Sequence, residues 1–271
     1  MTITPTAVPH LTAIGSGKGG TGKTLIAVSL AQALSREGER VLLCDADLGL
    51  SNAAVRLGLS VCGDLPALMC GTRPLEDCVV PVQGGAATEG GFDLVAAPSG
   101  SGALANAGAL AAENLMARLR GAKKYDRVLI DLAAGVDAAV MRFASAADEA
   151  LLVLTPDPAS LTDAYAFAKL LLKLTGTRMP RVIVNMSESE AEARRTQEAM
   201  MATCKAFLKC APALLGHVPR DAQAQDAVRR QLPLLARLPH GPAARALIEI
   251  ARGLHDAGDP ALQKSRLASK R

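Results

Sequence analysis

The strongest constraint on the fold is a glycine-rich segment, residues 17–24, which lies between a short apolar run and a helix-length segment. It reads Gly-Lys-Gly-Gly-Thr-Gly-Lys-Thr and fits the GxxxxGK[ST] spacing of a phosphate-binding loop. Residues 11–16 before it predict a buried strand, and residues 23–37 predict a helix. A helix N-terminus adds a partial positive charge toward a bound phosphate. The segment therefore predicts nucleotide binding by a P-loop protein.

Each position of the loop is a candidate contact to the phosphates of ATP or ADP. These positions are Gly17, Lys18, Gly19, Gly20, Thr21, Gly22, Lys23 and Thr24. The glycines let backbone N–H groups turn inward because no Cβ stands in the way. We expect Lys23 to contact the β- and γ-phosphates and the Thr24 hydroxyl to bind Mg²⁺.

The rest of the chain alternates between strand-like and helix-like segments. This alternation predicts βαβ crossovers, and so an α/β fold: a mainly parallel twisted sheet with helices on both faces. The predicted strands are residues 11–16, 40–45, 92–97, 127–132, 150–155, 180–185 and 214–218. The predicted helices are residues 23–37, 106–123, 137–147, 161–175, 190–208 and 244–254, and residues 81–91, with four glycines, predict an exposed loop.

Length and composition predict one P-loop domain over residues 1–271, with a short extension at 1–10 and a flexible basic tail at 256–271. Aromatic residues make up only 2% of the chain, which argues against aromatic platforms for single-stranded nucleic acid. The six cysteines form no CxxC pair, no secretion signal is evident and no apolar stretch reaches membrane-spanning length. We therefore expect a cytoplasmic protein, with peripheral contact to the inner face of the cell membrane through the tail as a hypothesis.

Acidic residues follow two of the predicted strands. Asp45 and Asp47 come after the second strand, and Asp131 ends the strand at 127–132. Ligands of open parallel sheets gather at this carboxyl edge, where carboxylates can hold Mg²⁺ and orient a water for phosphoryl transfer. An alternative role for Asp45 or Asp47 is the capping of a helix.

The loop together with these acidic motifs resembles the deviant Walker A ATPases of the MinD/ParA family. The resemblance implies slow ATP hydrolysis and an ATP-dependent homodimer in which Lys18 reaches the partner's phosphates. It assigns the attacking water to Asp47, and the metal surroundings to Asp45 and Asp131 together with Thr24. Lys18 and Lys23 complete the catalytic set. Leu132 stands where the family usually has Thr or Ser.

The resemblance extends to the base of the nucleotide. Asn185 ends a predicted strand, and Pro219, Arg220 and Asp221 follow the last one. In the family the matching Asn bonds the adenine edge and the Pro-x-Asp loop lines the base pocket. A side-chain amide suits adenine because it can both donate and accept hydrogen bonds. A simple turn role for Asn185 remains an alternative.

Residues 11–253 resemble one branch of the family most closely, the FlhG (FleN) regulators of flagellar number, and residues 155–165 are the most discriminating segment. This branch implies a dimerising switch that regulates flagellar number, placement or gene expression. The expected partners are an FlhF-like GTPase or a flagellar transcription activator.

Two other functions use the same fold. A ParA-type ATPase would position or segregate DNA or another cargo through Arg194, Arg195, Arg229 and Arg230, but a net charge of +4 is small for such a footprint, so DNA is not the expected partner. An iron–sulfur reductase would need cysteines after the Asp131 motif, and none occurs between residues 132 and 203. A corrinoid amidase would need a further glutaminase portion.

Overall fold

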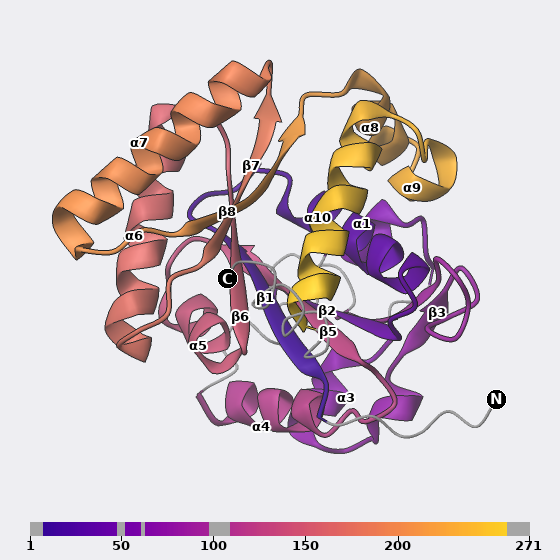
Figure 1. The fold of residues 1–271 in the computed structure, drawn as a ribbon. Helices are drawn as coiled ribbons and strands as arrows, with labels where there is room; N and C mark the ends of the chain where they lie inside the picture. The colour runs from indigo at the N-terminus through magenta and orange to yellow at the C-terminus, as the bar shows by residue number, and fades with distance from the viewer. Residues whose placement is uncertain (1–7, 48–51, 61–62, 98–108, 259–271) are drawn as a thin grey trace, which may run out of the picture.

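The computed structural model describes residues 8–47, 52–60, 63–97 and 109–258. Within them eight strands form one sheet in the order β3-β4-β2-β5-β1-β6-β7-β8 (Figure 1). The strands are β1 (His10–Ser16), β2 (Val41–Ala46), β3 (Val80–Val82), β4 (Phe92–Val95), β5 (Arg127–Ala134), β6 (Glu149–Leu154), β7 (Arg181–Ser187) and β8 (Ala213–Pro219). All neighbours are parallel except β3 and β4, so the predicted α/β fold with a mainly parallel sheet is confirmed.

The helices divide between the two faces of the sheet. They are α1 (Lys23–Arg36), α2 (Ala53–Arg56), α3 (Leu65–Cys70), α4 (Ala109–Arg120), α5 (Ala138–Ala146), α6 (Pro158–Thr175), α7 (Glu190–Leu208), α8 (Ala222–Arg229), α9 (Leu234–Arg237) and α10 (Pro242–Gly258), with a 3₁₀ turn η1 (Leu75–Asp77). One hydrophobic cluster joins the sheet to α3–α7, and a second joins it to α1, α2 and α8–α10.

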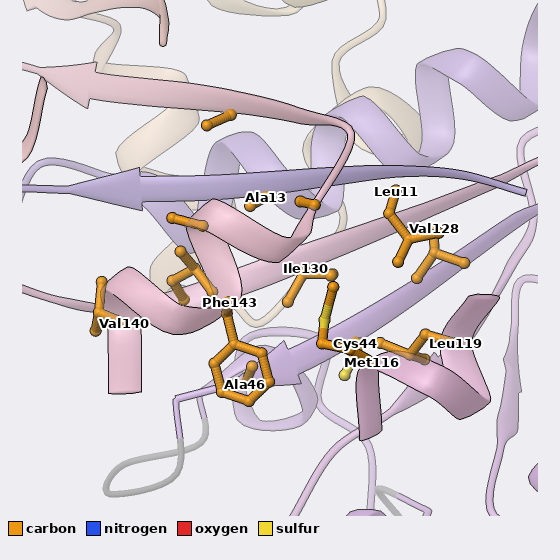
Figure 2. Close-up of a cluster of buried hydrophobic side chains, with 14 of the residues drawn as sticks. Leu11, Ala13, Cys44, Ala46, Met116, Leu119, Val128, Ile130, Val140 and Phe143 are labelled. Atoms are coloured by element: carbon orange, nitrogen blue, oxygen red, sulfur yellow. The ribbon is translucent and has the colours of Figure 1, made fainter. Parts of the chain in front are cut away.

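Small and aliphatic side chains fill the first cluster. Figure 2 shows Phe143 of α5 and Met116 of α4 beside alternate residues of β1, β2 and β5, such as Ala13 and Ile130. Alternate residues of a strand point to one face, so each central strand contributes to both clusters. Strands buried on both faces read as continuous apolar runs, which is why the sequence predicts them within a few residues.

Helix α6 begins earlier than the predicted start at residue 161. Pro158 occupies the first turn, and the Asp157 carboxylate accepts the Ser160 backbone N–H at 2.9 Å as the N-cap. Proline suits this position because its missing N–H has no helical partner there. The predicted stop at Gly176 is confirmed, since Gly176 caps the helix with a left-handed φ of 77°.

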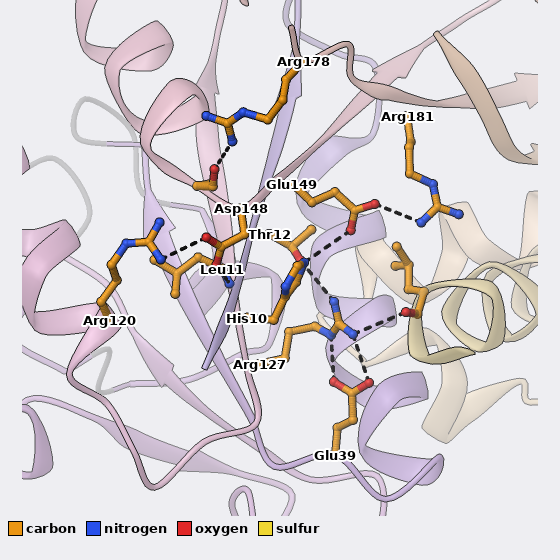
Figure 3. Close-up of polar contacts among 12 residues, drawn as sticks. His10, Leu11, Thr12, Glu39, Arg120, Arg127, Asp148, Glu149, Arg178 and Arg181 are labelled. Carbon is orange, nitrogen blue, oxygen red and sulfur yellow. Dashed lines mark hydrogen bonds and ion pairs between the residues drawn. The ribbon is translucent and has the colours of Figure 1, made fainter. Parts of the chain in front are cut away.

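Charged residues begin several strands at the amino edge of the sheet (Figure 3). Arg127 opens β5 and binds Glu39 through two hydrogen bonds, at 2.7 and 3.1 Å, with both side chains buried. Its guanidinium also reaches the Thr12 hydroxyl and the carbonyl of Leu254 in α10. The pair therefore ties the sheet to the loop after α1 and to the last described helix.

The expected exposed loop at residues 81–91 is only partly correct. Its first residues, Pro81 and Val82, belong to edge strand β3, and Gly85, Ala86 and Gly91 are buried. Of the predicted extension at 1–10, residues 1–7 lie outside the described residues and His10 already begins β1. Of the predicted flexible tail at 256–271, residues 256–258 belong to α10 and residues 259–271 lie outside the described residues.

Candidate nucleotide site

The main cavity lies at the carboxyl edge of the sheet, opposite the charged edge. It has a volume of about 440 Å³. Predicted site residues lining it are Gly19, Gly20, Thr21, Gly22, Lys23, Thr24, Asp47, Asn185, Pro219 and Asp221. Gly17, Lys18, Asp45 and Asp131 do not line it, although Asp45 and Asp131 contact residues that do.

The loop from β1 to α1 has the backbone shape needed to cradle an anion. Gly20 and Gly22 have left-handed φ angles of 79° and 84°, and Gly22 caps α1. A Cβ at Gly22 would lie 2.3 Å from the Asn185 side-chain nitrogen, and one at Gly17 would meet the backbone of Asp163. Glycine is therefore required at both positions for steric reasons.

Lys23 and Asp131 form a buried ion pair beneath the loop. The Lys23 ammonium donates to Asp131 Oδ1 at 2.9 Å, and the two side chains are 8% and 1% exposed. The second oxygen of Asp131, Oδ2, is buried without a hydrogen-bond partner in the described part of the chain. A buried carboxylate oxygen without a partner is costly, so this atom has capacity for a further ligand.

Asp45 organises the segment that follows β2. Its Oδ1 accepts the Asp47 N–H at 3.1 Å, and its Oδ2 accepts the N–H groups of Asn52 and Ala53 at 2.9 Å. Asp45 therefore supports the start of α2 from β2, whereas the N-cap residue of that helix is Asn52, so Asp45 is not an N-cap itself. Asp45 lies beside Asp131 in the β2–β5 register. Burial, followed by the charges of these two carboxylates, raises the pKa of the Cys44 thiol and keeps it protonated.

The segment after Asp131 is fastened to the phosphate-binding loop. Gly135, with φ 103°, donates its backbone N–H to the Ser16 carbonyl at 2.9 Å. This hydrogen bond joins the end of β5 to the end of β1. Leu132, which stands where the family usually has Thr or Ser, is fully buried and is part of the hydrophobic core.

Lys18 is held by its own chain. Its ammonium lies 2.7 Å from Asp157 Oδ1, with the side chains 34% and 43% exposed. Thr155 donates its hydroxyl to the other Asp157 oxygen at 2.6 Å. Lys18, followed by Thr155, lowers the pKa of Asp157 to about 2, so the carboxylate stays charged at neutral pH.

On the base side, two predicted residues also hold the site together. Asn185 donates its side-chain NH₂ to the Thr21 carbonyl at 2.7 Å, which connects β7 to the phosphate-binding loop. Asp221 caps α8 by accepting the Gln223 and Ala224 N–H groups, and it accepts the Ala243 N–H from α10. Both residues line the cavity while bracing its walls.

Comparison with known families agrees with this geometry. The family model for the CobQ/CobB/MinD/ParA nucleotide binding domain matches residues 12–234. The chain belongs to this family. The matched range contains the whole phosphate-binding loop and all the predicted site residues.

Two bacterial relatives are similar to this chain over most of its length. The antiactivator FleN of Pseudomonas aeruginosa is 34% identical over 256 residues, covering 94% of this chain and 89% of FleN. The flagellum site-determining protein YlxH of Helicobacter pylori is 32% identical over 194 residues, covering 71% of this chain and 63% of YlxH. Among solved structures, the septum site-determining protein MinD with Mg-ADP from Pyrococcus horikoshii has a TM-score of 0.75 and 28% identity, covering 91% of this chain and 96% of MinD.

Magnesium fits the residues of this MinD/ParA-family site. The open Oδ2 of Asp131 lies beneath the loop, and Thr24 lines the cavity one position after Lys23. Among the described residues no three His, Cys, Asp or Glu side chains form a group able to hold a metal. Mg²⁺ usually keeps several waters and takes phosphate oxygens as ligands, so it does not need such a group.

Several cavity residues of this family member carried no sequence motif. Ala224, Gln225, Val228 and Arg229 come from α8, Ala243 and Leu247 come from α10, and Arg56 comes from α2. The four α8 residues follow Asp221 at positions that face one side of a helix. That spacing is a sequence signal that could have identified them as cavity residues. Arg56 had no comparable signal.

Proposed function

We propose that this chain is a MinD-type ATPase whose nucleotide state controls dimerisation and thereby regulates flagellar number or placement. The observation that carries the proposal is the buried Lys23–Asp131 pair under a complete phosphate-binding loop, in a chain 34% identical to FleN over 94% of its length. The MinD relative with bound Mg-ADP supports ATP and ADP as the ligands.

In the proposed site, each residue has a separate task. Lys23 and the N-terminus of α1 bind the β- and γ-phosphates. Thr24 and Asp131 hold Mg²⁺, which neutralises charge on the phosphate oxygens when bound. Asp47, placed on the cavity wall by Asp45, orients the attacking water. The acceptor oxygen of Asn185 and the Pro219–Asp221 loop receive adenine.

Dimerisation is assigned to Lys18. Its ammonium leaves Asp157 and contacts the phosphates of the partner copy, in the manner of an arginine finger. The exposed surroundings of the Lys18–Asp157 contact support this, because an ion pair of that kind contributes about 1 kcal/mol or less and is easily exchanged.

The flagellar role is tested by deleting the gene in its own organism and counting flagella by electron microscopy. We expect altered number or placement, restored by the wild-type gene and not by an Asp47→Ala version. An unchanged flagellar pattern in the deletion strain would overturn the flagellar assignment.

Two partners are proposed for the switch. The name of the relative FleN, an antiactivator, supports a transcription activator, here a flagellar one, and an FlhF-like GTPase is the second candidate. A DNA partner is less well supported, because Arg194 and Arg230 are already paired with Glu190 and Asp226. Pull-down with ATP from cells expressing the tagged protein would distinguish these partners.

Peripheral membrane contact is assigned to the tail. Four basic residues, Lys264, Arg266, Lys270 and Arg271, supply the charge, and they lie outside the described residues. None of the helices described in the structure could span a bilayer. Sedimentation with anionic liposomes and ATP tests the contact, and protein that stays in the supernatant at low salt would contradict it.

A further inference from the structure

An arginine on α2 lies in the nucleotide cavity without a partner for its buried nitrogen. Arg56 follows Asn52 by four residues and lines the cavity together with Asn52 and Asp47. Its Nε is buried and has no hydrogen-bond partner among the described residues. No ion pair to Arg56 occurs among them either, although the chain pairs most of its other half-buried arginines.

The position of Arg56 is fixed from two sides. Asp45 accepts the N–H groups of Asn52 and Ala53, which anchors the start of α2 to β2. At the other end, Gly58 approaches Gln231, with only 3.4 Å available to a Cβ. The guanidinium is therefore presented from a braced segment rather than from a loose surface chain.

Basic side chains outnumber acidic ones in the lining of the cavity around Arg56, where the carboxylates are Asp47 and Asp221. Arg220, Arg229 and Lys23 line the same cavity. Lys23 is neutralised by Asp131 and Arg220 by Glu188, whereas no ion pair to Arg229 occurs in the described part of the chain. Asp221 directs both of its oxygens to backbone N–H groups. Arg56 is half-buried, and its buried Nε without a hydrogen-bond partner among the described residues is unfavourable until an acceptor such as an anion arrives.

We infer that Arg56 is a phosphate-contacting residue of the nucleotide site, acting in its own chain from the side of α2. This inference rests on the proposed function. A guanidinium suits a phosphate because its planar fork can donate two parallel hydrogen bonds. Because Arg56 and Asn52 share one short segment, nucleotide binding also holds that segment against the cavity.

The test measures dissociation constants of ATP, ADP and adenosine for Arg56→Gln by calorimetry with Mg²⁺. We expect ATP and ADP to bind about ten- to hundredfold more weakly than to the wild type, as for the loss of a charged hydrogen bond. Adenosine should bind equally well to both proteins. Arg56→Lys, which keeps the charge and loses the fork, should lie between them.

Arg230→Gln is the matched control. Arg230 follows α8, carries the same charge, pairs with Asp226 and does not line the cavity, so its loss should leave all three constants unchanged. Circular dichroism verifies folding, and Arg56→Lys serves if Arg56→Gln fails to fold.

Equal ATP affinity in Arg56→Gln and wild type would overturn the assignment. A matching loss of adenosine affinity would also overturn it, because the contact would then be to the base or ribose. If the wild type itself binds no ATP, the proposed function fails first, so the two failures are distinguishable.

Discussion

At the scale of single residues, the glycines of the phosphate-binding loop differ in how much space their neighbours leave for a side chain. Gly22 combines a left-handed φ with the close approach of Asn185, whereas a Cβ at Gly19 would meet no atom within 4 Å. The two glycines look alike in the sequence motif. The structure separates a glycine required by packing from one whose replacement the unliganded fold tolerates.

We predict that Gly22→Ala lowers the melting temperature, because strained φ and a clash with Asn185 together cost about 2 kcal/mol or more. Gly19→Ala should melt within about 2 °C of the wild type, as expected for a difference below about 0.5 kcal/mol. Differential scanning fluorimetry without nucleotide measures both. Equal melting temperatures for the two variants would contradict the steric argument.

Asp47 and Lys18 have opposite predicted effects on assembly. Asp47→Ala should remove the orientation of the attacking water and trap the ATP-bound dimer, while Lys18→Ala should weaken the dimer and leave ATP binding largely intact. Size-exclusion chromatography with ATP, combined with calorimetric binding, measures both effects. A Lys18→Ala protein that cannot bind ATP at all would exclude a role in trans.

At the scale of secondary structure elements, the Asp157 carboxylate links the start of helix α6 to the phosphate-binding loop. It caps α6 through Ser160 and holds Lys18, and Lys18 is the larger cause of its lowered pKa of about 2. A lowered pKa means that the contact stabilises the fold above the ordinary value of 3.8 and that this contribution is lost as the pH falls through about 2.

We predict that Lys18→Ala raises the pKa of Asp157 toward its ordinary value, since the main cause of the shift is gone. Carbon-detected NMR of the Asp157 carboxyl between about pH 5 and pH 3 measures this, where wild-type Asp157 should remain ionised. Asp157→Asn is the stability control, because asparagine still caps a helix but cannot form the ion pair. An unchanged pKa in Lys18→Ala would contradict the contact.

The elements that the sequence predicts well are those whose pattern is local. Seven strands and the long helices follow from apolar runs and capping residues. Strand β3 was missed because it is three residues long and contains Pro81, and α2, α3 and α9 were missed because four to six residues carry no periodicity. The eight-residue helix α8 was also missed, although Asp221 stands at its start as a capping residue. The start of α6 was placed three residues too late, because Asp157 and not a later residue caps it.

The residues of the candidate site also divide into those that a local pattern predicts and those that only tertiary packing brings together. The phosphate-binding loop is contiguous, so spacing alone places Lys23 and Thr24. The Lys23–Asp131 and Asn185–Thr21 contacts join residues 108 and 164 positions apart, and the Arg56 position depends on how α2 packs against the α8–α9 connection. Such contacts are decided by tertiary packing, which no local pattern encodes.

At the scale of the whole molecule, the two edges of the sheet have different roles. The carboxyl edge holds the cavity, and the amino edge holds the buried Arg127–Glu39 pair, which Figure 3 shows with its link to α10. Removing one member of a buried pair leaves the other charge uncompensated.

We predict that Glu39→Gln lowers the free energy of unfolding by about 3–5 kcal/mol without altering residues of the nucleotide site. Glu37→Gln is the control, because Glu37 pairs with the largely exposed Arg252 and should change stability by about 1 kcal/mol or less. Urea unfolding measures both. Equal losses would show that burial does not distinguish the two pairs.

The central strand β1 has a consequence for how the protein is made. Among the described residues it is the first strand, and it pairs there with β5 and β6, which end at residues 134 and 154. During synthesis, β1 and its glycine loop must wait for more than a hundred further residues before these hydrogen-bond partners leave the ribosome. Nascent chains therefore pass through a long interval in which an apolar strand is unpaired and prone to aggregation.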